Sequence, residues 1–376
     1  MSLSLTKFTK KLNSKSLTKF LLPLIKGLKE IEEIKPTSNK PIEFSFDKQI
    51  KSLVYYHLND YKSGREFLQA THESSLVKEV VSCDGISKST FFDAISSRGV
   101  EQLIELFTFL KQYAQTILPR QYKELGQLVP IDGSFIEATL SMHWADYRKK
   151  SNKAKVHFGL NLNQGIPKKL FLTTGKSDER PFVSKILDQG ETGILDRYYQ
   201  KHQCFDQWSK EGLFYVCRIK ENTQFEIIQE NTLKTSKLIM KDAKVILGSL
   251  DSNKTTEPVR LIIYKVDGTT YYVATNRFDL TAEKIALIYK LRWQVEKFFV
   301  WWKRHLKVYH LLSRSEHGLL VQILSGLITY FLFSIYCNNC FKEKVSIRRI
   351  RQLRNHILNE LMSVSDENQI EAKVPI

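Results

Sequence analysis

The chain has 376 residues, about two and a half times the typical domain length, so we expect two or three structural units around at least one full core. Hydrophobic residues make up 42% of it, which excludes a largely disordered chain, because such chains lack the apolar surface that offsets ordering entropy. The net charge of +17 favours a polyanionic partner, either nucleic acid or an acidic membrane face, over a role in solubility alone.

The cysteines and the N-terminal residues indicate the cellular compartment in which the protein is expected. Five cysteines, an odd number without a paired framework, favour a reducing environment. The N-terminal residues carry charge without the continuous apolar core of a secretory signal, so we expect a cytoplasmic protein. The uncharged stretch 319–337 is nearly long enough to span a bilayer, but its polar residues fit a buried core helix as well. We therefore expect no membrane association.

The N-terminal third is expected to be helical. Residues 1–34 have the pattern of short amphipathic helices, and 44–118 show few strand signals. A turn at residues 84–86 precedes a short polar-faced helix that resembles the second half of a helix-turn-helix, whose N-terminal side chains read base edges. We assign residues 1–120 to a helical DNA-binding region. The candidate DNA contacts in it are Ser87, Lys88, Ser89, Thr90 and Arg98.

After Pro119 the pattern changes to short apolar runs bounded by turns, which is typical of strands. Three strands are followed by helix, strand, helix and strand, the order of a ribonuclease-H-like α/β core. We assign residues 121–221 to the first part of that core. The elements are expected at 128–131, 155–162 and 169–174 (strands), 178–187 (helix), 192–195 (strand), 205–211 (helix) and 213–220 (strand).

Residues 222–280 predict a β-rich insertion domain, and their turn Asp267-Gly268 is the strongest hairpin signal in the chain. From Thr281 a long helix is expected to about Lys307, and residues 281–335 complete the core. Residues 336–376 predict a basic helical tail. This tail is interpreted first as a solvated basic face. The alternative is that it binds DNA or a second subunit. Its arginines are Arg348, Arg349, Arg351 and Arg354.

Four functional side chains lie on the long helix. A step of about 100° per residue places Tyr289, Arg292, Glu296 and Lys303 in one sector about 60° wide, beside the apolar stripe. Glu296 has two explanations at this point. It is either the partner of Arg292 one turn earlier, or a metal ligand flanked by phosphate-binding cations.

Two aspartates favour the second explanation. Asp132 and Asp196 each follow a short apolar run, where a strand is expected to leave its sheet and where α/β sites are assembled. Two strand-end aspartates and a helix glutamate are the hard oxygen ligands that Mg²⁺ accepts. His157, between apolar neighbours on a predicted strand, is interpreted as structural. The remaining carboxylates near the core are interpreted as surface or capping residues: Glu137, Asp146, Asp178 and Glu191.

These residues carry a resemblance to a known family. The spacing Tyr289-x-x-Arg292-x-x-x-Glu296-x-x-x-x-x-x-Lys303 resembles the YREK signature of bacterial insertion-sequence transposases of the IS-four type, part of the DDE superfamily. The segments VPIDGSFIE, GILDRYY and LFYVCRIKEN are similar to the blocks around the two aspartates of that family. The β-rich stretch resembles its insertion domain, so that the resemblance covers roughly residues 125–335.

The resemblance implies roles for individual residues. Asp132, Asp196 and Glu296 would bind two Mg²⁺ ions, for which Mn²⁺ can substitute; one activates water and later a 3′ hydroxyl, and the other stabilises the leaving oxygen. Phosphates near the transposon end would be contacted by Tyr289, Arg292 and Lys303. Apart from the resemblance, Arg218 and Lys220 at the end of their predicted strand are either further phosphate contacts or a solvated strand end. Excision through a hairpin would hold a flipped base by stacking. The candidates for that stacking are Trp293, Trp301, Tyr264, Tyr271 and Tyr272.

We therefore predict a cut-and-paste DNA transposase. It would act as a homodimer on double-stranded DNA, namely terminal inverted repeats and target DNA, in the bacterial cytoplasm and associated with the nucleoid. Three alternatives remain: another ribonuclease-H-like nuclease, a catalytically inactive transposase-derived DNA-binding protein, and a membrane protein anchored by residues 319–337. Retention of all three carboxylates and of the full helix motif disfavours the inactive protein.

Overall fold

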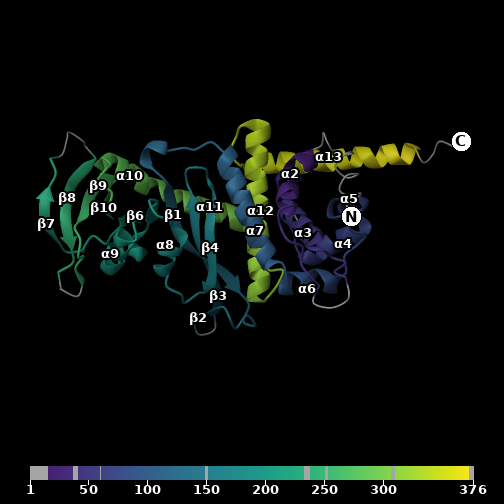
Figure 1. Ribbon diagram of the computed structural model, residues 1–376, viewed down its shortest axis with the longest axis horizontal. Helices are drawn as coiled ribbons and strands as arrows, with labels where there is room; N and C mark the ends of the chain where they lie inside the picture. Colours follow the sequence, from purple (N-terminus) through teal and green to yellow (C-terminus); the bar gives the residue numbers. More distant parts are fainter. Residues whose placement is uncertain are drawn as a thin grey trace. The chain divides into compact units, whose positions relative to one another are not determined.

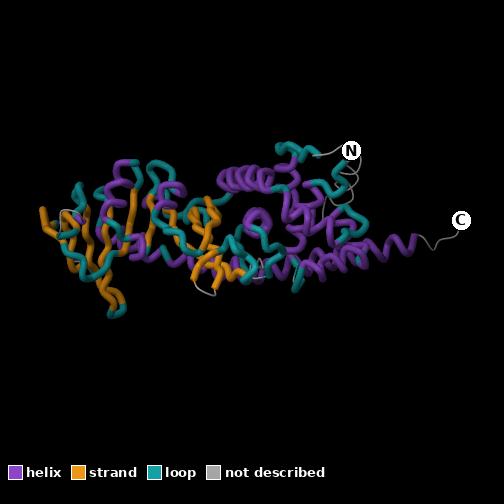
Figure 2. Tube along the Cα trace, turned by 90° about the horizontal axis from the view of Figure 1, so that it is seen from below, coloured by secondary structure: helices purple, strands orange, loops and turns teal. Residues whose placement is uncertain are grey.

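A computed structural model describes residues 16–36, 41–59, 61–148, 151–232, 238–249, 253–305 and 310–371. It divides into two compact units. The first combines residues 1–118 with residues 302–376, and the second is the continuous stretch 119–301. Among the described residues, the strands lie in the second unit, and the first is built from helices (Figure 2).

The first unit is organised around one long apolar helix, α12, which contacts α7, α3, α6 and α2 (Figure 1). This helix is long and apolar enough to cross a membrane, but 89% of its most apolar window is buried within the protein. Two of its buried polar side chains are hydrogen-bonded there: the Ser325 hydroxyl lies 3.0 Å from His57 Nε2, and the Gln322 amide bonds the backbone of Leu312 and His310. These contacts favour the core helix over the membrane span. The helices of this unit are α2 (Ser16–Leu28), α3 (Phe46–Leu58), α4 (Gly64–Glu73), α5 (Ser75–Val81), α6 (Lys88–Ser97), α7 (Val100–Ile117), α12 (Glu316–Phe341) and α13 (Ile347–Glu371).

The second unit is built on one ten-stranded sheet. Its strands are β1 (Leu128–Ala138), β2 (Asp146–Arg148), β3 (Ser151–Asn161), β4 (Ile166–Thr174), β5 (Thr192–Leu195), β6 (Phe214–Arg218), β7 (Phe225–Glu230), β8 (Ile239–Leu247), β9 (Val259–Val266) and β10 (Thr269–Thr275). Its helices are η1 (Lys123–Leu125), α8 (Pro181–Ile186), η2 (Arg197–Tyr199), α9 (His202–Lys210), α10 (Ala282–Leu291) and α11 (Trp293–His305), the last of which continues into the first unit.

The pairing of the first five long strands is mixed. β1 is antiparallel to β3 and β3 to β4, whereas β1 is parallel to β5 and β5 to β6. The predicted order of strands and helices is confirmed, and the mixed α/β architecture is consistent with a ribonuclease-H-like transposase. The strands of the β-rich stretch extend this same sheet, because β10 pairs antiparallel with β6 and is followed by β9, β8 and β7.

Alternation along the strands creates two cores. Val129, Leu195 and Cys217 face one side and pack with α8 and α9, while Leu128 and Ile194 face the other side and pack with α10. Because successive strand residues point to opposite faces, β1, β5 and β6 each contribute to both cores. The sheet is thereby covered on both faces, as expected when buried parallel strands carry continuous apolar runs.

Three sequence predictions need correction. The predicted helix 281–307 is two helices, α10 and α11, which meet at Arg292; its last two residues lie outside the described part of the chain. The amides of Arg292 and Val295 bond carbonyls three residues earlier, so the helix tightens locally at the junction. The predicted helix 178–187 is shorter and begins at Pro181. The first predicted strand is longer, because pairing with β3 continues β1 to Ala138.

Candidate active site

Asp132 lies where β1 leaves its parallel neighbour. The pairing of β1 with β5 ends at Pro130, and from Ile131 onward β1 pairs with β3. Asp132 is therefore inside the strand, and not at its end as predicted, but it still marks the end of the parallel pairing. Burial raises the pKa of Asp132 to about 7; Arg292 opposes this shift, and the negative charges of Asp196 and Glu179 add to it.

Asp196 follows β5 directly, as predicted. It caps the short helix η2, where its Oδ1 accepts a hydrogen bond of 2.8 Å from the amide of Tyr198. Because β1 and β5 are adjacent and parallel, their carboxyl ends meet at the same edge of the sheet. The structure therefore brings Asp132 and Asp196 together, and their mutual repulsion is one cause of the raised pKa of Asp132.

Glu296 is placed on α11, which packs on the sheet beside Asp132. Phe158, the β3 residue opposite Asp132, stacks on Phe298 with ring centroids 4.9 Å apart. The Glu296 carboxylate forms an ion pair with Arg292, and the charge of Arg292 also acts on Asp132. The structure contains the ion pair between Glu296 and Arg292, which was the first explanation of Glu296. The pair lies close enough to Asp132 for the charge of Arg292 to act on it, so the second explanation, a metal ligand, would require the pair to open.

The chemistry of this donor set fits a divalent cation in part. Asp132 and Asp196 supply hard oxygen atoms, and the negative charge of Asp196 acts on Asp132. Among the described residues, however, no group of three or more His, Cys, Asp or Glu side chains is arranged to hold a metal ion. Glu296 would have to exchange Arg292 for the cation in order to complete the set.

Tyr289 on α10 and Arg218 on β6 contact a pair of tyrosines on β9 and β10. Burial raises the pKa of Tyr289 to about 12, and its ring lies 6.0 Å from that of Tyr271. Tyr271 stacks on Tyr264 at 5.2 Å and also contacts the Arg218 guanidinium, 4.8 Å from the ring centroid. Tyr264 and Tyr271 are thus engaged in packing, which disfavours them as platforms for a flipped base.

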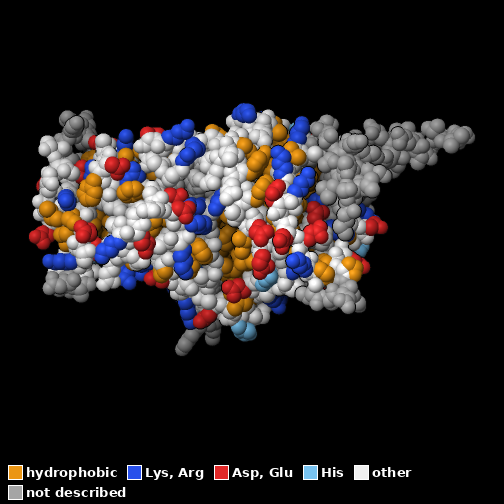
Figure 3. Space-filling view, viewed as in Figure 1, with side chains coloured by type: hydrophobic (Ala, Val, Ile, Leu, Met, Phe, Trp, Pro, Cys, Tyr) orange, Lys and Arg blue, Asp and Glu red, His pale blue; other side chains and the backbone are white. Residues whose placement is uncertain are grey.

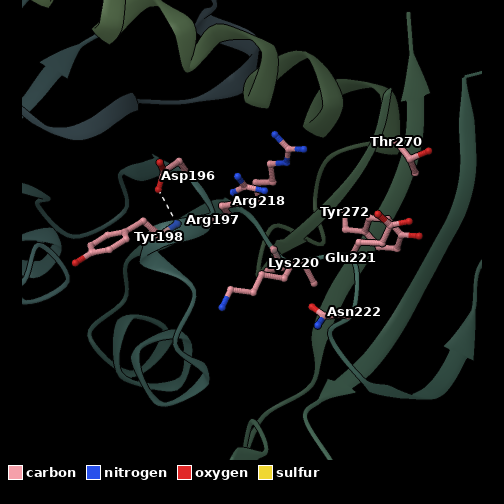
Figure 4. A pocket seen from close by; sticks show the side chains of 10 residues that line it. Asp196, Arg197, Tyr198, Arg218, Lys220, Glu221, Asn222, Thr270 and Tyr272 are labelled. Atoms are coloured by element: carbon pink, nitrogen blue, oxygen red, sulfur yellow. Dashed lines mark hydrogen bonds between the residues drawn. The ribbon is translucent and has the colours of Figure 1, made fainter. Parts of the chain in front are cut away.

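A cavity of about 700 Å³ opens beside Asp196. Figure 4 shows Asp196 and Tyr198 from the turn after β5, Arg218 and Lys220 from the end of β6, and Tyr272 from β10 around this space. The cavity brings one candidate catalytic carboxylate together with both predicted β6 cations. Its remaining lining residues are Arg197, Ile219, Glu221, Asn222 and Thr270.

Glu179, just before α8, is a site residue that sequence reasoning missed. Its side chain is only 12% exposed, accepts a hydrogen bond of 2.8 Å from the Tyr199 hydroxyl and pairs with Lys155. It also lies against Gly133, the residue after Asp132. No local pattern marks it, because all of these contacts join segments far apart in the sequence.

The other carboxylates singled out in the sequence each pair with a lysine or an arginine. Glu137 pairs with Lys153 at 2.6 Å and Glu191 with Lys168 at 2.8 Å. Lys176 pairs with Asp146, and Arg180 with Asp178, in agreement with surface roles. His157 Nε2 lies 2.8 Å from the Thr173 hydroxyl, and the His157 ring stacks on Phe182, as expected for a structural histidine.

The remaining candidate residues lie on helices. Trp293 is 55% exposed at the start of α11, and Lys303 is near the end of that helix, in the part that belongs to the first unit. On α6 the side chains of Ser87, Lys88 and Thr90 are exposed at its N-terminus.

Two arginines of the C-terminal helix are engaged in contacts. Arg349 pairs with Glu343, and Arg354 donates to the Leu58 carbonyl oxygen. Arg348 and Arg351 are exposed on the same helix, α13.

Comparison with known proteins identifies the family of the chain. Residues 123–332 match the family described as the transposase DDE domain, which is more than half of the chain. A protein of Sinorhizobium fredii named as a candidate transposase, y4zB, is 26% identical over 65% of this chain and 69% of its own length. The probable transposase of insertion sequence element IS5377 from Geobacillus stearothermophilus is 28% identical over 58% of this chain and 59% of its own length.

A third relative extends the comparison. The protein named as a candidate transposase of element IS4SA from a Synechocystis species is 27% identical over 66% of this chain and 71% of its own length. The matched region contains Asp132, Asp196 and Glu296 and the whole ten-stranded sheet. The chain therefore belongs to the DDE transposases of bacterial insertion sequences, of the IS-four type.

Proposed function

We propose that this enzyme moves its insertion sequence by cut-and-paste transposition, cleaving DNA at the element's ends and joining them to target DNA. The observation that carries the proposal is the pair Asp132 and Asp196 at one edge of adjacent parallel strands, next to a cavity bordered by Arg218 and Lys220. Two oxygen donors beside a cationic cavity are suited to phosphoryl transfer on a polyanionic substrate.

Asp132, Asp196 and Glu296 would hold the divalent ions. Members of the family depend on divalent metal ions, and two ions, Mg²⁺ or Mn²⁺, would activate water or a 3′ hydroxyl and stabilise the leaving oxygen. Glu296 would turn from Arg292 toward the aspartates. Arg292, once released, would be free to bind a phosphate through its planar guanidinium.

The remaining parts would hold DNA. Arg218 and Lys220 border the cavity and would bind the backbone near the scissile bond, with Tyr289 and Lys303 contributing from the α10–α11 segment. In the first unit, the exposed N-terminal side chains of α6 would contact the terminal inverted repeats. For the flipped base of a hairpin intermediate, Tyr272 in the cavity and the exposed Trp293 are favoured over Tyr264 and Tyr271, which stack on each other.

The proposed organisation follows from these roles. Residues 1–120 would bind DNA, 121–221 and 281–301 would form the catalytic core, and 222–280 would form the insertion. Residues 302–335, predicted to complete the core, belong instead to the helical first unit, and 336–376 would be the basic tail. Two copies would act together on the two ends of the element. The protein would work in the bacterial cytoplasm, in association with the nucleoid.

The experiment is strand cleavage of a labelled duplex that carries the element's own end, in Mg²⁺. The wild type should nick at the end, whereas Asp132→Ala, Asp196→Ala and Glu296→Ala should bind the duplex without cutting it. Glu137→Ala is the matched control, because this carboxylate is paired with Lys153 and should leave cleavage unchanged. Binding without cleavage by the wild type under every divalent ion would instead identify an inactive DNA-binding protein.

A further inference from the structure

We propose that Glu179 is a positioning residue that ties the strand bearing Asp132 to the turn bearing Asp196, and thereby sets the geometry of the cation site. This inference rests on the proposed function of the two aspartates. It adds a residue that lies outside the DDE carboxylates and outside the helix motif.

The Glu179 carboxylate joins three segments. Its Oε2 accepts a hydrogen bond of 2.8 Å from the hydroxyl of Tyr199, which lies in η2, the short helix capped by Asp196. Its Oε1 lies 3.2 Å from Lys155 Nζ, on β3 opposite β1. Lys155 is 5% exposed and also donates to the Ser177 carbonyl oxygen at 2.9 Å. One carboxylate therefore connects η2, which Asp196 caps, to β3, the strand paired with the strand that carries Asp132.

Gly133 shows how close the Glu179 carboxylate lies to β1, on the face next to α8. A Cβ atom at Gly133 would be 2.5 Å from the carboxyl carbon of Glu179, closer than any real contact. Gly133 is a paired residue of β1, opposite His157, and does not adopt a left-handed backbone conformation. The glycine after Asp132 is therefore explained by the space that Glu179 occupies, not by backbone conformation.

The arrangement is costly for folding alone. Glu179 places a third negative charge beside Asp132 and Asp196, and the three charges also surround the buried hydroxyl of Tyr199. Burying like charges together is unfavourable unless cations compensate for them. Here Lys155 pairs with Glu179, and Arg292 opposes the repulsion at Asp132 while it is also paired with Glu296. A bound divalent cation between the aspartates would relieve this repulsion, so the position of Glu179 suits a role in holding the cation site.

The test measures Mn²⁺ binding to the full-length protein without DNA, by electron paramagnetic resonance of the free ion. Glu179→Ala should weaken Mn²⁺ binding roughly 10- to 100-fold, the usual cost of removing a residue that orients metal ligands. Glu179→Gln should lie between Glu179→Ala and the wild type, because glutamine still accepts from Tyr199 but does not pair with Lys155. Glu191→Gln is the matched control, a largely buried carboxylate paired with Lys168 in the same unit, and should bind Mn²⁺ as the wild type does.

Two further variants keep the test decisive if Glu179→Ala does not fold. Tyr199→Phe removes only the hydroxyl that Glu179 accepts from, and should weaken Mn²⁺ binding in the same direction by a smaller factor. Gly133→Ala should push the carboxylate away and weaken binding as Glu179→Ala does, but should add little in the Glu179→Ala background. Circular dichroism checks that each variant is folded. If Glu179 only stabilised the fold, the folded variants would bind Mn²⁺ with the affinity of the wild type.

The outcomes separate the two proposals. If the folded Glu179→Ala and Tyr199→Phe variants bind Mn²⁺ as the wild type does while Asp132→Asn does not, the role of Glu179 is wrong and the aspartate site stands. If the wild type and Asp132→Asn bind Mn²⁺ equally, the aspartate site itself is wrong. Equal losses for Glu179→Ala and Glu191→Gln would show a general charge effect and would also overturn the role of Glu179.

Discussion

At the scale of single residues, the site is defined by how charges are shared. Arg292 pairs with Glu296 and also acts on Asp132, while Glu179 adds negative charge from the other side. The same residue types elsewhere in the unit form ordinary surface pairs, such as Lys153 with Glu137. What distinguishes the site is therefore not the presence of carboxylates, but the burial of Asp132 beside two charges of its own sign.

Arg292 and a bound cation would compete for Glu296, so removing Arg292 should change Mn²⁺ binding and DNA cleavage in opposite directions. Arg292→Ala should tighten Mn²⁺ binding to the DNA-free protein by about fivefold, corresponding to about 1 kcal/mol of charge repulsion removed. The same variant should slow cleavage of the element's end by at least about tenfold, because a phosphate contact is lost. Mn²⁺ titration and single-turnover cleavage measure the two effects, with the exposed Lys297→Ala on the same helix as control. Weaker Mn²⁺ binding in Arg292→Ala would contradict the exchange.

His157 predicts a pH dependence of stability. Burial lowers the pKa of His157 to about 4, helped by Lys155 and Lys185 and opposed by Asp178. Because the folded pKa lies below the ordinary value near 6.5, the unfolded chain takes up the proton first, and stability falls as the pH drops from about 6.5 toward 4. His157→Gln should therefore lose about 2 kcal/mol less stability than the wild type between pH 7 and pH 5, measured by urea unfolding. Equal losses would show that His157 does not carry this dependence.

At the scale of secondary-structure elements, the sheet beyond β6 contains a buried ion pair. Arg260 on β9 donates two hydrogen bonds of 2.8 Å to Asp242 on β8, and its third nitrogen bonds the carbonyl oxygens of Arg277 and Leu280. Burial alone would raise the pKa of Asp242, but hydrogen bonds from Arg260 and Asn231 outweigh it and hold this pKa below its usual range. Arg260 thus joins β9 to β8 through Asp242, and joins both strands to the segment that leads into α10.

Arg260→Met should destabilise the protein by about 3 to 5 kcal/mol, since it leaves the buried Asp242 without its partner. Lys241→Met is the control on the same strand as Asp242, because Lys241 forms a more exposed pair with Glu230 and should cost below about 1 kcal/mol. Urea unfolding at pH 7 measures both. A cost for Arg260→Met no larger than that of Lys241→Met would contradict a structural role for this pair.

Elements with strong local patterns could be predicted from the sequence. The hairpin of β9 and β10 is confirmed at Asp267-Gly268, where both residues have positive φ (48° and 78°) as a tight two-residue turn requires. Features that depend on distant segments could not be predicted. The pairing of β10 with β6 joins the β-rich stretch to the core sheet, and β3 extends β1 past Asp132. The contacts of Glu179 with Lys155 and Tyr199 are of the same long-range kind.

At the scale of the whole molecule, the net charge is +17, and the charged side chains are dispersed over the one face that Figure 3 draws. On the face drawn in Figure 3, lysine and arginine side chains lie among acidic ones and form no single patch among the described residues. A dispersed charge attracts DNA without selecting a site, whereas the cavity beside Asp196 gathers Arg197, Arg218 and Lys220 in one place. We therefore expect each of these three cations to make its own contact with a DNA phosphate.

DNA binding should weaken steeply with salt, because bound phosphates release counterions. Lys220→Gln should reduce the slope of log K against log salt concentration by about one, the value for one lost phosphate contact. Lys210→Gln, an exposed lysine at the end of α9 and away from the cavity, should leave the slope unchanged. Fluorescence anisotropy with a labelled end duplex across a salt series measures both. Equal slopes for Lys220→Gln and the wild type would remove Lys220 from the DNA contacts.

The central claim is that Asp132 and Asp196 hold the divalent ions that cleave DNA, and a change of ligand tests it most directly. Cysteine in place of either aspartate offers a softer ligand, which Mn²⁺ tolerates better than Mg²⁺. Asp132→Cys and Asp196→Cys should therefore fail to cleave the labelled element end in Mg²⁺ and regain cleavage in Mn²⁺. Full cleavage in Mg²⁺ by either variant would contradict the claim.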